Sequence, residues 1–533
     1  MTTTVATERP VPRGLVAWAA ATDHKRVALL TTVTALVLML VNGTLALIMR
    51  TELAAPGRQV VGLETYNEFF TTHGSGMIYF VVTPLALALG VYFVPLQVGA
   101  AEIAGPRLAL LGYWLYVSGA VALYGGFLTQ NGAAGFGWTA FPPLSDSTNS
   151  PGVGSDLWVL GVWLAVAGMT IHAGCILATL VSLRAPGMTM LRLPVFCWSM
   201  LVTALMALTS FPVLLVALAL LELDRRGVGI FTSSGGPAAY QHLFWFYGHP
   251  VVYVMFFPFV GAVAEVVATF SRRRVFGYHA MVLSLLAFAA LSMSVWAHHM
   301  FTTGQVTNQY FSLTSTAIAV PAGIEYFDLV ATMVGGSILF RTPMLFAIGF
   351  LLLFLLGGLT GIILASPPID YHLHDSFFVV AHFHYTLFAG SLFAFFAGIY
   401  YWFPKVTGAF LREGLGRLHF ALLFVGTNLA FSPMFLLGEK GMPRRVGDYR
   451  GSDGFTGLNV VSTVGAFVTA LGIAVFVWNV VVSLRRREPA GADPWEGQTL
   501  EWATSSPPPR HNFDALPAIR SFAPLLDLRE GKT

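Results

Sequence analysis

Six histidines in or beside apolar stretches are the residues of this sequence best suited to do chemistry. They are His73 in TTHGSGMIYF, His249 in FYGHPVVY, His298 and His299 in VWAHHMFTTG, and His382 and His384 in VVAHFHYTLF. A lone buried histidine is most often a neutral imidazole hydrogen-bonded to a neighbouring helix. Neutral imidazole is also the preferred ligand of copper and of haem iron. Six such residues together predict metal binding.

The spacing of these histidines indicates how they divide among metals. Residues two apart on an α-helix point about 200° away from each other, so His382 and His384 cannot share one metal but can reach two centres on opposite sides of one helix. That predicts two flanking haems. Adjacent residues differ by about 100°, so His298 and His299 can converge on one ion, and His249 is the natural third ligand.

The elements that must position these residues are transmembrane helices. Of 533 residues, 56% are hydrophobic and 10% are charged, unlike a soluble globular protein, and a helical crossing needs about 20 mostly apolar residues. Twelve such stretches recur: 27–49, 76–98, 110–130, 156–182, 193–221, 241–268, 278–302, 311–338, 343–365, 378–402, 417–438 and 457–483. We therefore expect an all-α polytopic membrane protein, a bundle of about twelve transmembrane helices.

Loop charges predict the orientation and the division of the chain. Arginine and lysine recur in alternate loops and in the tail, which by the positive-inside rule puts both termini in the cytoplasm. We expect a cytoplasmic segment over residues 1–26, a membrane domain over 27–484 and a polar cytoplasmic tail over 485–533. The net charge of +3 is small and scattered, which argues against nucleic acid as a partner.

Several long motifs together resemble one family. They are TDHKR, MRTEL, WFYGHPVVY, VWAHHMFTTG, HDSFFVVAHFHY, GMPRR and EWATSSPPPRHNF. The sequence resembles subunit I of the haem-copper oxidases, and in particular the bacterial cytochrome c oxidases, from about residue 22 to about residue 515. The family's twelve-helix bundle matches the number of spans that the hydropathy pattern predicts independently.

The resemblance implies a role for each histidine. His73 and His384 would be the axial ligands of a low-spin haem, His382 would be the proximal ligand of a high-spin haem, and His249, His298 and His299 would hold the copper ion that faces it. In this family a tyrosine at the position of Tyr253 is bonded covalently to the first copper histidine. Tyr253 lies four residues after His249 and so on the same helix face.

Further positions match residues that surround the metals in the family. Arg444 and Arg445 would hold haem propionates, and His374 with Asp375 would form a magnesium and propionate site. Arg50 would lie beside the low-spin haem and Trp138 near the high-spin one. For Arg50 the alternative is an interfacial arginine at a helix end, extended toward the lipid headgroups.

The implied reaction is the reduction of oxygen to water in a prokaryotic cell membrane. The implied cofactors are two a-type haems, a copper ion and Mg²⁺. Electrons would come from cytochrome c through a binuclear copper centre on subunit II, with subunit III as a further partner and lipid around the bundle. One alternative is a nitric oxide reductase of the same superfamily, although these typically lack the crosslinked tyrosine. The other is a secondary transporter, which does not need six histidines at ligand spacing.

The proton paths are where the sequence departs from the family. The common pattern GHPEVY reads GHPVVY here, so Val251 replaces a proton-carrying glutamate, and Tyr247 is the candidate to replace it. At the mouth of that path Glu102 stands where an aspartate is usual, while Val91 and Ala109 replace asparagines.

The second path is changed as well. Glu325 stands in place of a lysine, Asp328 in place of a serine and Ala322 in place of a threonine. Two carboxylates one turn apart repel each other unless one is protonated, and a protonated Glu325 could relay protons. The alternative is a solvated Glu325 near the inner surface. Proton uptake and possible pumping are therefore expected to use Tyr247, Glu102, Glu325 and Asp328.

Overall fold

The chain is represented by a computed structural model that describes residues 14–232 and 235–532, and within these ranges its regular structure is helical. The α-helices are α1 (Leu15–Ala19), α2 (His24–Glu52), α3 (Leu63–Ser75), α4 (Thr83–Gln97), α5 (Pro106–Gly125), α6 (Val153–Ser182), α7 (Val195–Leu223), α8 (Gly236–Val254), α9 (Phe257–Phe270), α10 (Tyr278–Ser292), α11 (Asn308–Ala317), α12 (Ala319–Met333), α13 (Thr342–Leu364), α14 (Pro367–Leu373), α15 (Phe377–Phe383), α16 (Phe393–Thr407), α17 (Glu413–Glu439), α18 (Thr456–Arg486) and α19 (Pro524–Arg529).

Shorter helices of other types interrupt or join these. Three are π-helices: η1 (Gly76–Val82), η4 (Asp224–Val228) and η6 (His384–Leu392). Five are 3₁₀-helices: η2 (Gly126–Leu128), η3 (Met190–Arg192), η5 (Trp296–Thr303), η7 (Gly451–Asp453) and η8 (Leu500–Ala503).

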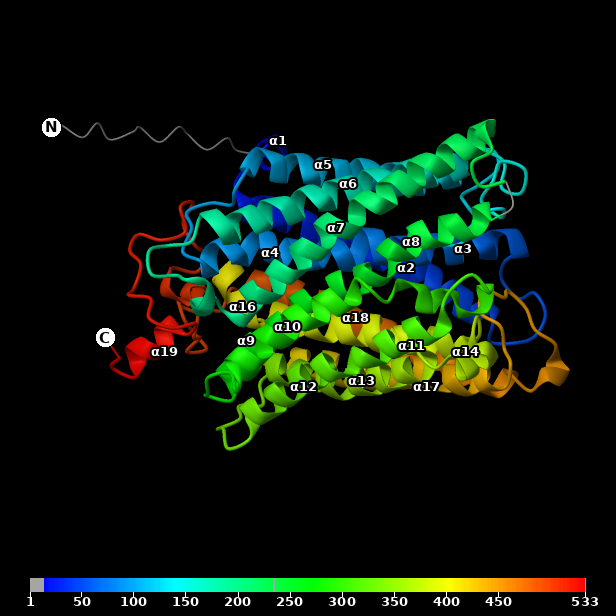
Figure 1. Ribbon diagram of the computed structural model, residues 1–533. Coiled ribbons are helices and arrows are strands. Elements are labelled where there is room, and N and C mark those ends of the chain that lie inside the picture. The colour runs from blue at the N-terminus through cyan, green and yellow to red at the C-terminus, as the bar shows by residue number, and fades with distance from the viewer. Residues whose placement is uncertain (1–13, 233–234, 533) are drawn as a thin grey trace.

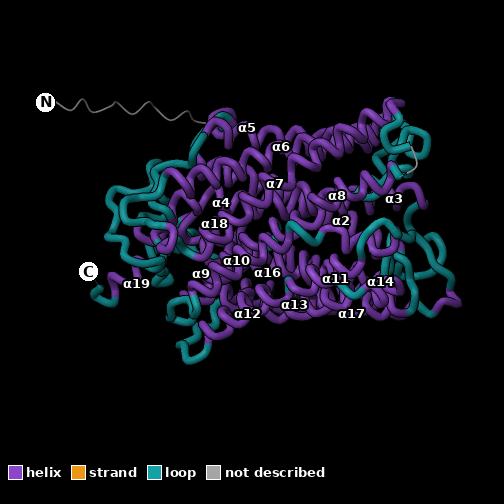
Figure 2. The backbone as a smooth tube through the Cα atoms, in the orientation of Figure 1, coloured by secondary structure: helices purple, strands orange, loops and turns teal. Residues whose placement is uncertain are grey.

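The long helices lie side by side along one axis, with the loops gathered at the two ends (Figures 1 and 2). Eleven helical stretches of the described residues are long and apolar enough to cross a membrane. The eighth predicted span is also helical, but it divides at Ile318 into α11 and α12, each too short to meet that length. The protein is an all-helical, multi-pass membrane protein of about twelve spans.

The second span differs from its predicted limits. Residues 76–98 were the apolar part, yet the helix begins at Leu63 and continues through α3, η1 and α4 to Gln97. Polar residues between Leu63 and Ser75 hid this beginning, because hydropathy marks the hydrocarbon depth and not the helix itself. His73 therefore lies inside the continuous helix.

Small residues let neighbouring helices approach closely, as is typical of membrane bundles. Where α5 crosses α6, a methyl group added at Gly119 would lie 2.4 Å from the carbonyl oxygen of Gly161, and one at Gly168 would lie 2.4 Å from that of Gly112. Gly465 on α18 approaches α17 in the same way, because a methyl group added there would collide with the amide nitrogen of Ala430. Backbones this close rigidify the frame around the histidines.

The C-terminal segment closes one end of the bundle and holds the beginning of α2. Lys25 Nζ donates to the carbonyl oxygen of Arg510 at 3.0 Å and to Asn512 Oδ1 at 2.8 Å. Asn512 Nδ2 donates to the carbonyl oxygen of Ala100 at 2.8 Å. His24 and Asn512 are fully buried, so the two ends of the chain share one packed interface.

Candidate metal centre

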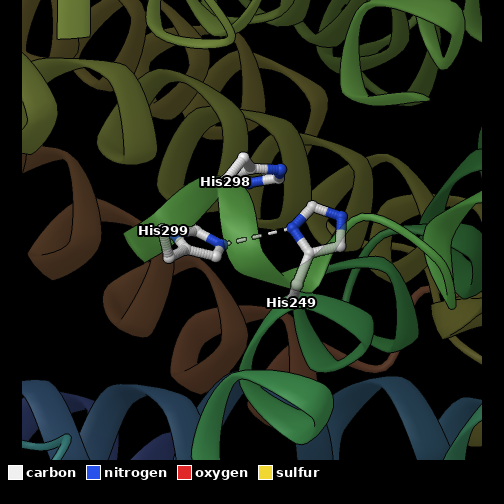
Figure 3. A group of neighbouring side chains, drawn as sticks. All are labelled: His249, His298 and His299. Carbon is white, nitrogen blue, oxygen red and sulfur yellow. Dashed lines mark hydrogen bonds between the residues drawn. The ribbon is translucent and has the colours of Figure 1, made fainter. Parts of the chain in front are cut away.

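Three imidazoles from two helices point toward one another (Figure 3). His249 lies on α8, and His298 with His299 lies on η5, so one ring approaches from one element and two from the other. One ring nitrogen of each lies within 4.8 Å of the others, and His249 Nδ1 is 3.2 Å from His299 Nε2. Three neutral imidazoles that converge without a carboxylate form a nitrogen donor set that suits copper.

Neighbouring side chains fix the two rings on η5. His298 Nδ1 lies 2.8 Å from Ser315 Oγ of α11, which leaves its Nε2 for the centre. The ring of His299 stacks on Trp245 of α8, with the ring centres 3.9 Å apart and the planes at 13°. The element is a 3₁₀-helix and not the α-helix assumed from the sequence, so adjacent side chains differ by about 120°. The two rings still converge, with centres 4.2 Å apart.

Tyr253 lies beside the first of these histidines. Its ring centre is 4.6 Å from that of His249, one helical turn along α8. His249 turns its Nδ1 toward His299, and its Nε2 is buried without a hydrogen-bond partner in the described residues. The imidazole therefore has one nitrogen in the cluster and the other available to a neighbour such as Tyr253.

His382 is oriented by the adjacent helix α13. Its Nδ1 lies 3.0 Å from Thr360 Oγ1 and 3.1 Å from the carbonyl oxygen of Gly357. A methyl group at Gly361 would lie 3.0 Å from the ring, so α13 needs a glycine at this approach. Because Nδ1 is engaged, Nε2 is the nitrogen that can bind a metal.

His73 and His384 are held by the same type of contact. His73 Nδ1 lies 2.9 Å from the carbonyl oxygen of Asn42, and His384 Nδ1 lies 2.8 Å from that of Val380. The His384 ring also stacks on Phe431, with ring centres 4.3 Å apart. The π-helices η1 and η6 begin three residues after His73 and at His384 itself, and π-helical turns often occur at functional sites.

The donor set fits the two haems and the copper ion that the sequence implies. Four histidines, namely His73, His298, His382 and His384, use Nδ1 for a hydrogen bond to protein oxygen. Metal-binding histidines usually direct one nitrogen at such an oxygen, which fixes the tautomer and the ring orientation. The hydrogen bonds thus prepare these rings to bind through Nε2.

Arg50 is buried beside the predicted low-spin haem ligands and does not extend to a surface. Its side chain is 8% exposed, and Nη2 donates to the carbonyl oxygen and Oδ1 of Asn459 at 3.0 and 2.9 Å. Nε and Nη1 are buried without partners among the residues described. Unpaired guanidinium nitrogens at this depth are costly, so the site fits a cofactor that supplies an acceptor, and the alternative of an interfacial arginine is wrong.

The arginine pair lies in the loop between α17 and α18, at one end of the bundle. Arg444 forms an ion pair with Asp375, and Arg445 has neither an ion pair nor a hydrogen bond to the described residues. Burial lowers the pKa of Arg445 to about 10, and the charge of Arg444 adds to this. A partly buried cation without an acid partner among the described residues favours a bound anion such as a carboxylate of a cofactor.

His374 and Asp375 lie next to this pair and at the end of α14. His374 Nδ1 is 3.4 Å from Asp370 Oδ2, and His374 Nε2 is 3.8 Å from Asp375 Oδ2. Partial burial raises the pKa of Asp375, but Arg444 and His374 outweigh it and hold the pKa below its usual range. An ionised Asp375 beside His374 can contribute to a cation site.

Trp138 packs against α8, the helix that carries His249. Its ring lies 5.8 Å from that of Trp245, which stacks on His299, and 5.2 Å from that of Phe244. Trp138 thus supports α8 at the side where His249 and Trp245 are placed. The structure puts it one ring away from the histidine cluster.

Tyr247 lies on α8 just before His249 and is fully buried. Its ring stacks on Tyr79, with centres 6.1 Å apart, and its hydroxyl has no hydrogen-bond partner in the described part of the chain. Val251, where relatives carry a glutamate, is also fully buried. The hydroxyl of Tyr247 is therefore a buried polar group that is free to change partners.

Glu325 and Asp328 lie on α12 and are 3% and 6% exposed. Both carboxylate oxygens of Glu325 and Oδ2 of Asp328 are buried without partners among the described residues. The alternative of a solvated Glu325 at the inner surface is therefore wrong. Two buried acids one turn apart avoid mutual repulsion when at least one of them carries a proton.

Glu102 is engaged by the beginning of α2. Its Oε1 accepts a hydrogen bond from the backbone nitrogen of His24 at 3.0 Å and also contacts the His24 ring. Burial raises the pKa of Glu102, but the bond to His24 outweighs it and the pKa falls below its usual range. Behind it, Val91 and Ala109 are fully buried, so an apolar region follows this carboxylate.

Several residues around the site were not singled out from the sequence. Ser315, Thr360 and Asn459 hold His298, His382 and Arg50. Another buried acid, Glu501 in η8, accepts hydrogen bonds from Gln97 and Trp402, each at 3.0 Å. These residues come from distant segments, and no local pattern in a single sequence links them to their partners.

Comparisons with known proteins agree over nearly the whole chain. The sequence profile of the family described as cytochrome c and quinol oxidase polypeptide I matches residues 26–468. A probable cytochrome c oxidase subunit 1-beta of Nocardia farcinica is 53% identical over 95% of this chain and 87% of its own length. A putative subunit 1-beta of Streptomyces coelicolor is 49% identical over 98% and 92%.

A relative named as cytochrome c oxidase subunit 1, from Corynebacterium efficiens, is 48% identical over 98% of this chain and 92% of its own. Among solved structures, a haem-copper terminal oxidase dimer matches with a TM-score of 0.74 over 87% of this chain and 84% of that one, at 20% identity, which supports the fold. The nitric oxide reductase alternative is thereby excluded. The chain belongs to the family of cytochrome c and quinol oxidase polypeptide I, as the haem- and copper-binding catalytic subunit of a terminal oxidase.

Proposed function

We propose that this subunit reduces oxygen with electrons from cytochrome c at a centre built on His249, His298, His299, His382 and Tyr253. The observation that carries the proposal is the convergence of three imidazoles, whose ligand nitrogens lie within 4.8 Å of one another. When bound, the copper ion and the high-spin haem supply the site at which oxygen is held and reduced. Tyr253 lies close enough to His249 to deliver a proton and an electron from the side of α8.

In this proposal His73 and His384 hold the low-spin haem, and Arg50 donates to a polar group of that cofactor from its two unpaired nitrogens. Arg444 and Arg445 hold the propionates, Trp138 supports the high-spin side, and His374 with Asp375 binds Mg²⁺. We infer from the family resemblance that both haems are a-type.

Proton delivery is assigned to Tyr247 and to the pair Glu325 and Asp328. Each offers a buried polar atom without a protein partner, as expected for a group that exchanges protons with internal water. Glu102 is the weakest of the four candidates, because His24 occupies its Oε1. Proton pumping would then depend on Tyr247 in place of the missing glutamate.

The proposed partners are subunit II, which would carry a binuclear copper centre, and subunit III. We place the protein in a prokaryotic cell membrane with both termini in the cytoplasm, on the basis of the arginine distribution. The proposal is tested by measuring oxygen consumption of the purified enzyme complex with each electron donor. Turnover with reduced cytochrome c and not with a quinol is the expected result, whereas turnover with a quinol alone would reject cytochrome c as the donor.

A further inference from the structure

Basic side chains line a hollow close to α19, whose Asp527 pairs with Arg274 of the lining. Figure 1 shows α19 at one end of the bundle. The hollow has a volume of about 510 Å³, and the residues around it come from the α6–α7 loop, the α9–α10 loop and the C-terminal segment. Arg192, Arg274, His279 and Arg520 are among them, and no aspartate or glutamate lines it. None of the residues that line the hollow belongs to those assigned to the function proposed above.

The charges of the hollow are only partly compensated. Arg274 forms ion pairs with Asp527 and Glu530 at 2.6 and 2.7 Å. Arg192 donates only to the carbonyl oxygens of Gly187 and Ile519, both at 3.0 Å. Arg520 and His279 form neither hydrogen bonds nor ion pairs with side chains in the described ranges. Among the described residues, no carboxylate pairs with the guanidinium groups of Arg192 and Arg520.

The wall of the hollow is fixed before any ligand binds. The ring of Tyr278 stacks on Phe522, with centres 4.1 Å apart and planes at 2°. The Tyr278 hydroxyl donates to the carbonyl oxygen of Leu193 at 2.7 Å and accepts from Trp198 Nε1 at 3.0 Å. These contacts join α7, α10 and the C-terminal segment. A preformed site loses less conformational entropy on binding.

A further feature indicates the kind of anion. Leu191, which lines the hollow, is 59% exposed, and Phe276, which follows the lining residue Val275 in the α9–α10 loop, is 57% exposed. At the end of transmembrane helices, exposed apolar side chains meet acyl chains. A small soluble anion would leave both side chains in water.

We propose that this hollow binds the phosphate headgroup of an anionic phospholipid, with Arg192 and Arg520 at the phosphate and Leu191 and Phe276 against the acyl chains. Basic pockets between transmembrane helices recognise such headgroups elsewhere. A soluble phosphate compound shares the charge but not the apolar contact.

The test uses the purified enzyme complex in nanodiscs of phosphatidylcholine containing a trace of spin-labelled phosphatidylglycerol. The variant Arg192→Gln/Arg520→Gln is compared with Arg485→Gln/Arg486→Gln, which removes two exposed arginines at the end of α18. With about 1 kcal/mol per basic residue near an anionic headgroup, the first variant should bind the probe about 25-fold more weakly. The second should bind it like the wild type.

The single variant Arg520→Gln is a control for misfolding, because Arg520 makes no bond to the described residues and its loss should not disturb the fold. We expect this variant to bind the probe about fivefold more weakly. Haem absorbance and oxygen turnover verify that each variant is folded. Equal binding by the two double variants would overturn the proposal. Displacement of the probe from the wild type by inorganic phosphate or ATP would overturn the lipid assignment and identify a soluble anion as the ligand.

Discussion

The histidine centre and the candidate proton groups differ in how the protein holds their polar atoms. Each of His73, His298, His382 and His384 has one ring nitrogen bonded to protein oxygen. Tyr247, Glu325 and Asp328 have buried oxygens without such partners in the part of the chain described. Metal ligands must be oriented in advance, whereas a group that passes protons must be free to change partners.

The largest effect is expected from removing a ligand of the centre. His298→Ala should lower copper content and oxygen turnover by more than about 100-fold, above the range found for residues that only support a ligand. Metal analysis and oxygen consumption measure this. The ring nitrogen that faces the centre is lost, while α10 and η5 keep their apolar packing. Full copper occupancy in the variant would remove His298 from the ligand set.

Removing the partner of that ligand should have a smaller effect. Ser315→Ala deletes the 2.8 Å contact to His298 Nδ1 and should weaken copper retention about 10- to 100-fold. Ser312→Ala is the matched control on α11, because Ser312 Oγ donates to the carbonyl oxygen of Ala365 and touches no histidine. Equal copper loss in both variants, measured by titration with a chelator, would indicate damage to α11 rather than loss of orientation.

On the side of the proton groups, Glu325→Gln keeps the shape and removes the exchangeable proton. Turnover should fall about tenfold, equivalent to about 1.4 kcal/mol in the activation barrier, with haem spectra unchanged. The variant should also unfold at an equal or higher temperature, since an unpaired buried acid is replaced by an amide. Normal turnover would leave Glu325 without a part in proton uptake. Asp328→Asn distinguishes which of the two acids carries the effect.

Tyr247→Phe and Tyr240→Phe compare two fully buried tyrosines on the same helix. The Tyr240 hydroxyl donates to the carbonyl oxygen of Thr139 at 3.1 Å, while that of Tyr247 has no partner among the described residues. Tyr240→Phe should cost about 1 kcal/mol of stability and keep turnover. Tyr247→Phe should keep stability and slow turnover or proton release in vesicles about fivefold. The reverse result would reject Tyr247 as the substitute for the missing glutamate.

The smallest effect is expected at the ion pair between Asp375 and Arg444. Because the folded pKa of Asp375 is depressed, the ionised carboxylate stabilises the fold above its unfolded value of about 3.9. This contribution is lost as the pH falls through the folded pKa. The side chain is 56% exposed, so Asp375→Asn should cost less than about 1 kcal/mol. Acid unfolding followed by haem absorbance measures it, and a larger loss would indicate a bound cation.

The sequence predicts the ligands of the centre better than the residues that support them. Apolar stretches locate the spans, and ligand spacing brings His249 to His298 and His299 without any knowledge of the fold. The π-helices at His73 and His384, the 3₁₀-helix at His298 and the early beginning at Leu63 were not predicted. Their cause is packing between helices, which hydropathy does not record.

The burial of Glu325 and Arg50 could not be predicted either. Arg50 follows the limit of the predicted span 27–49, where a charged side chain is ordinarily expected to reach water or lipid headgroups. Glu325 stands in the middle of the predicted span 311–338, and the sequence does not identify the helices that cover it. The structure covers them with neighbouring helices instead. Composition within one segment gives no sign of this, because the covering residues, such as Asn459, come from far along the chain.

The bonds between Lys25 and residues 510–512 have a consequence for biosynthesis. The first transmembrane helix leaves the ribosome hundreds of residues before Arg510 and Asn512 exist. Until then, Lys25 and His24 must remain in water or be held by another protein, because a buried lysine without acceptors is unstable. Closure of this end of the bundle is therefore among the last steps of folding. A chain truncated before residue 510 would lack the acceptors of Lys25 at the beginning of α2.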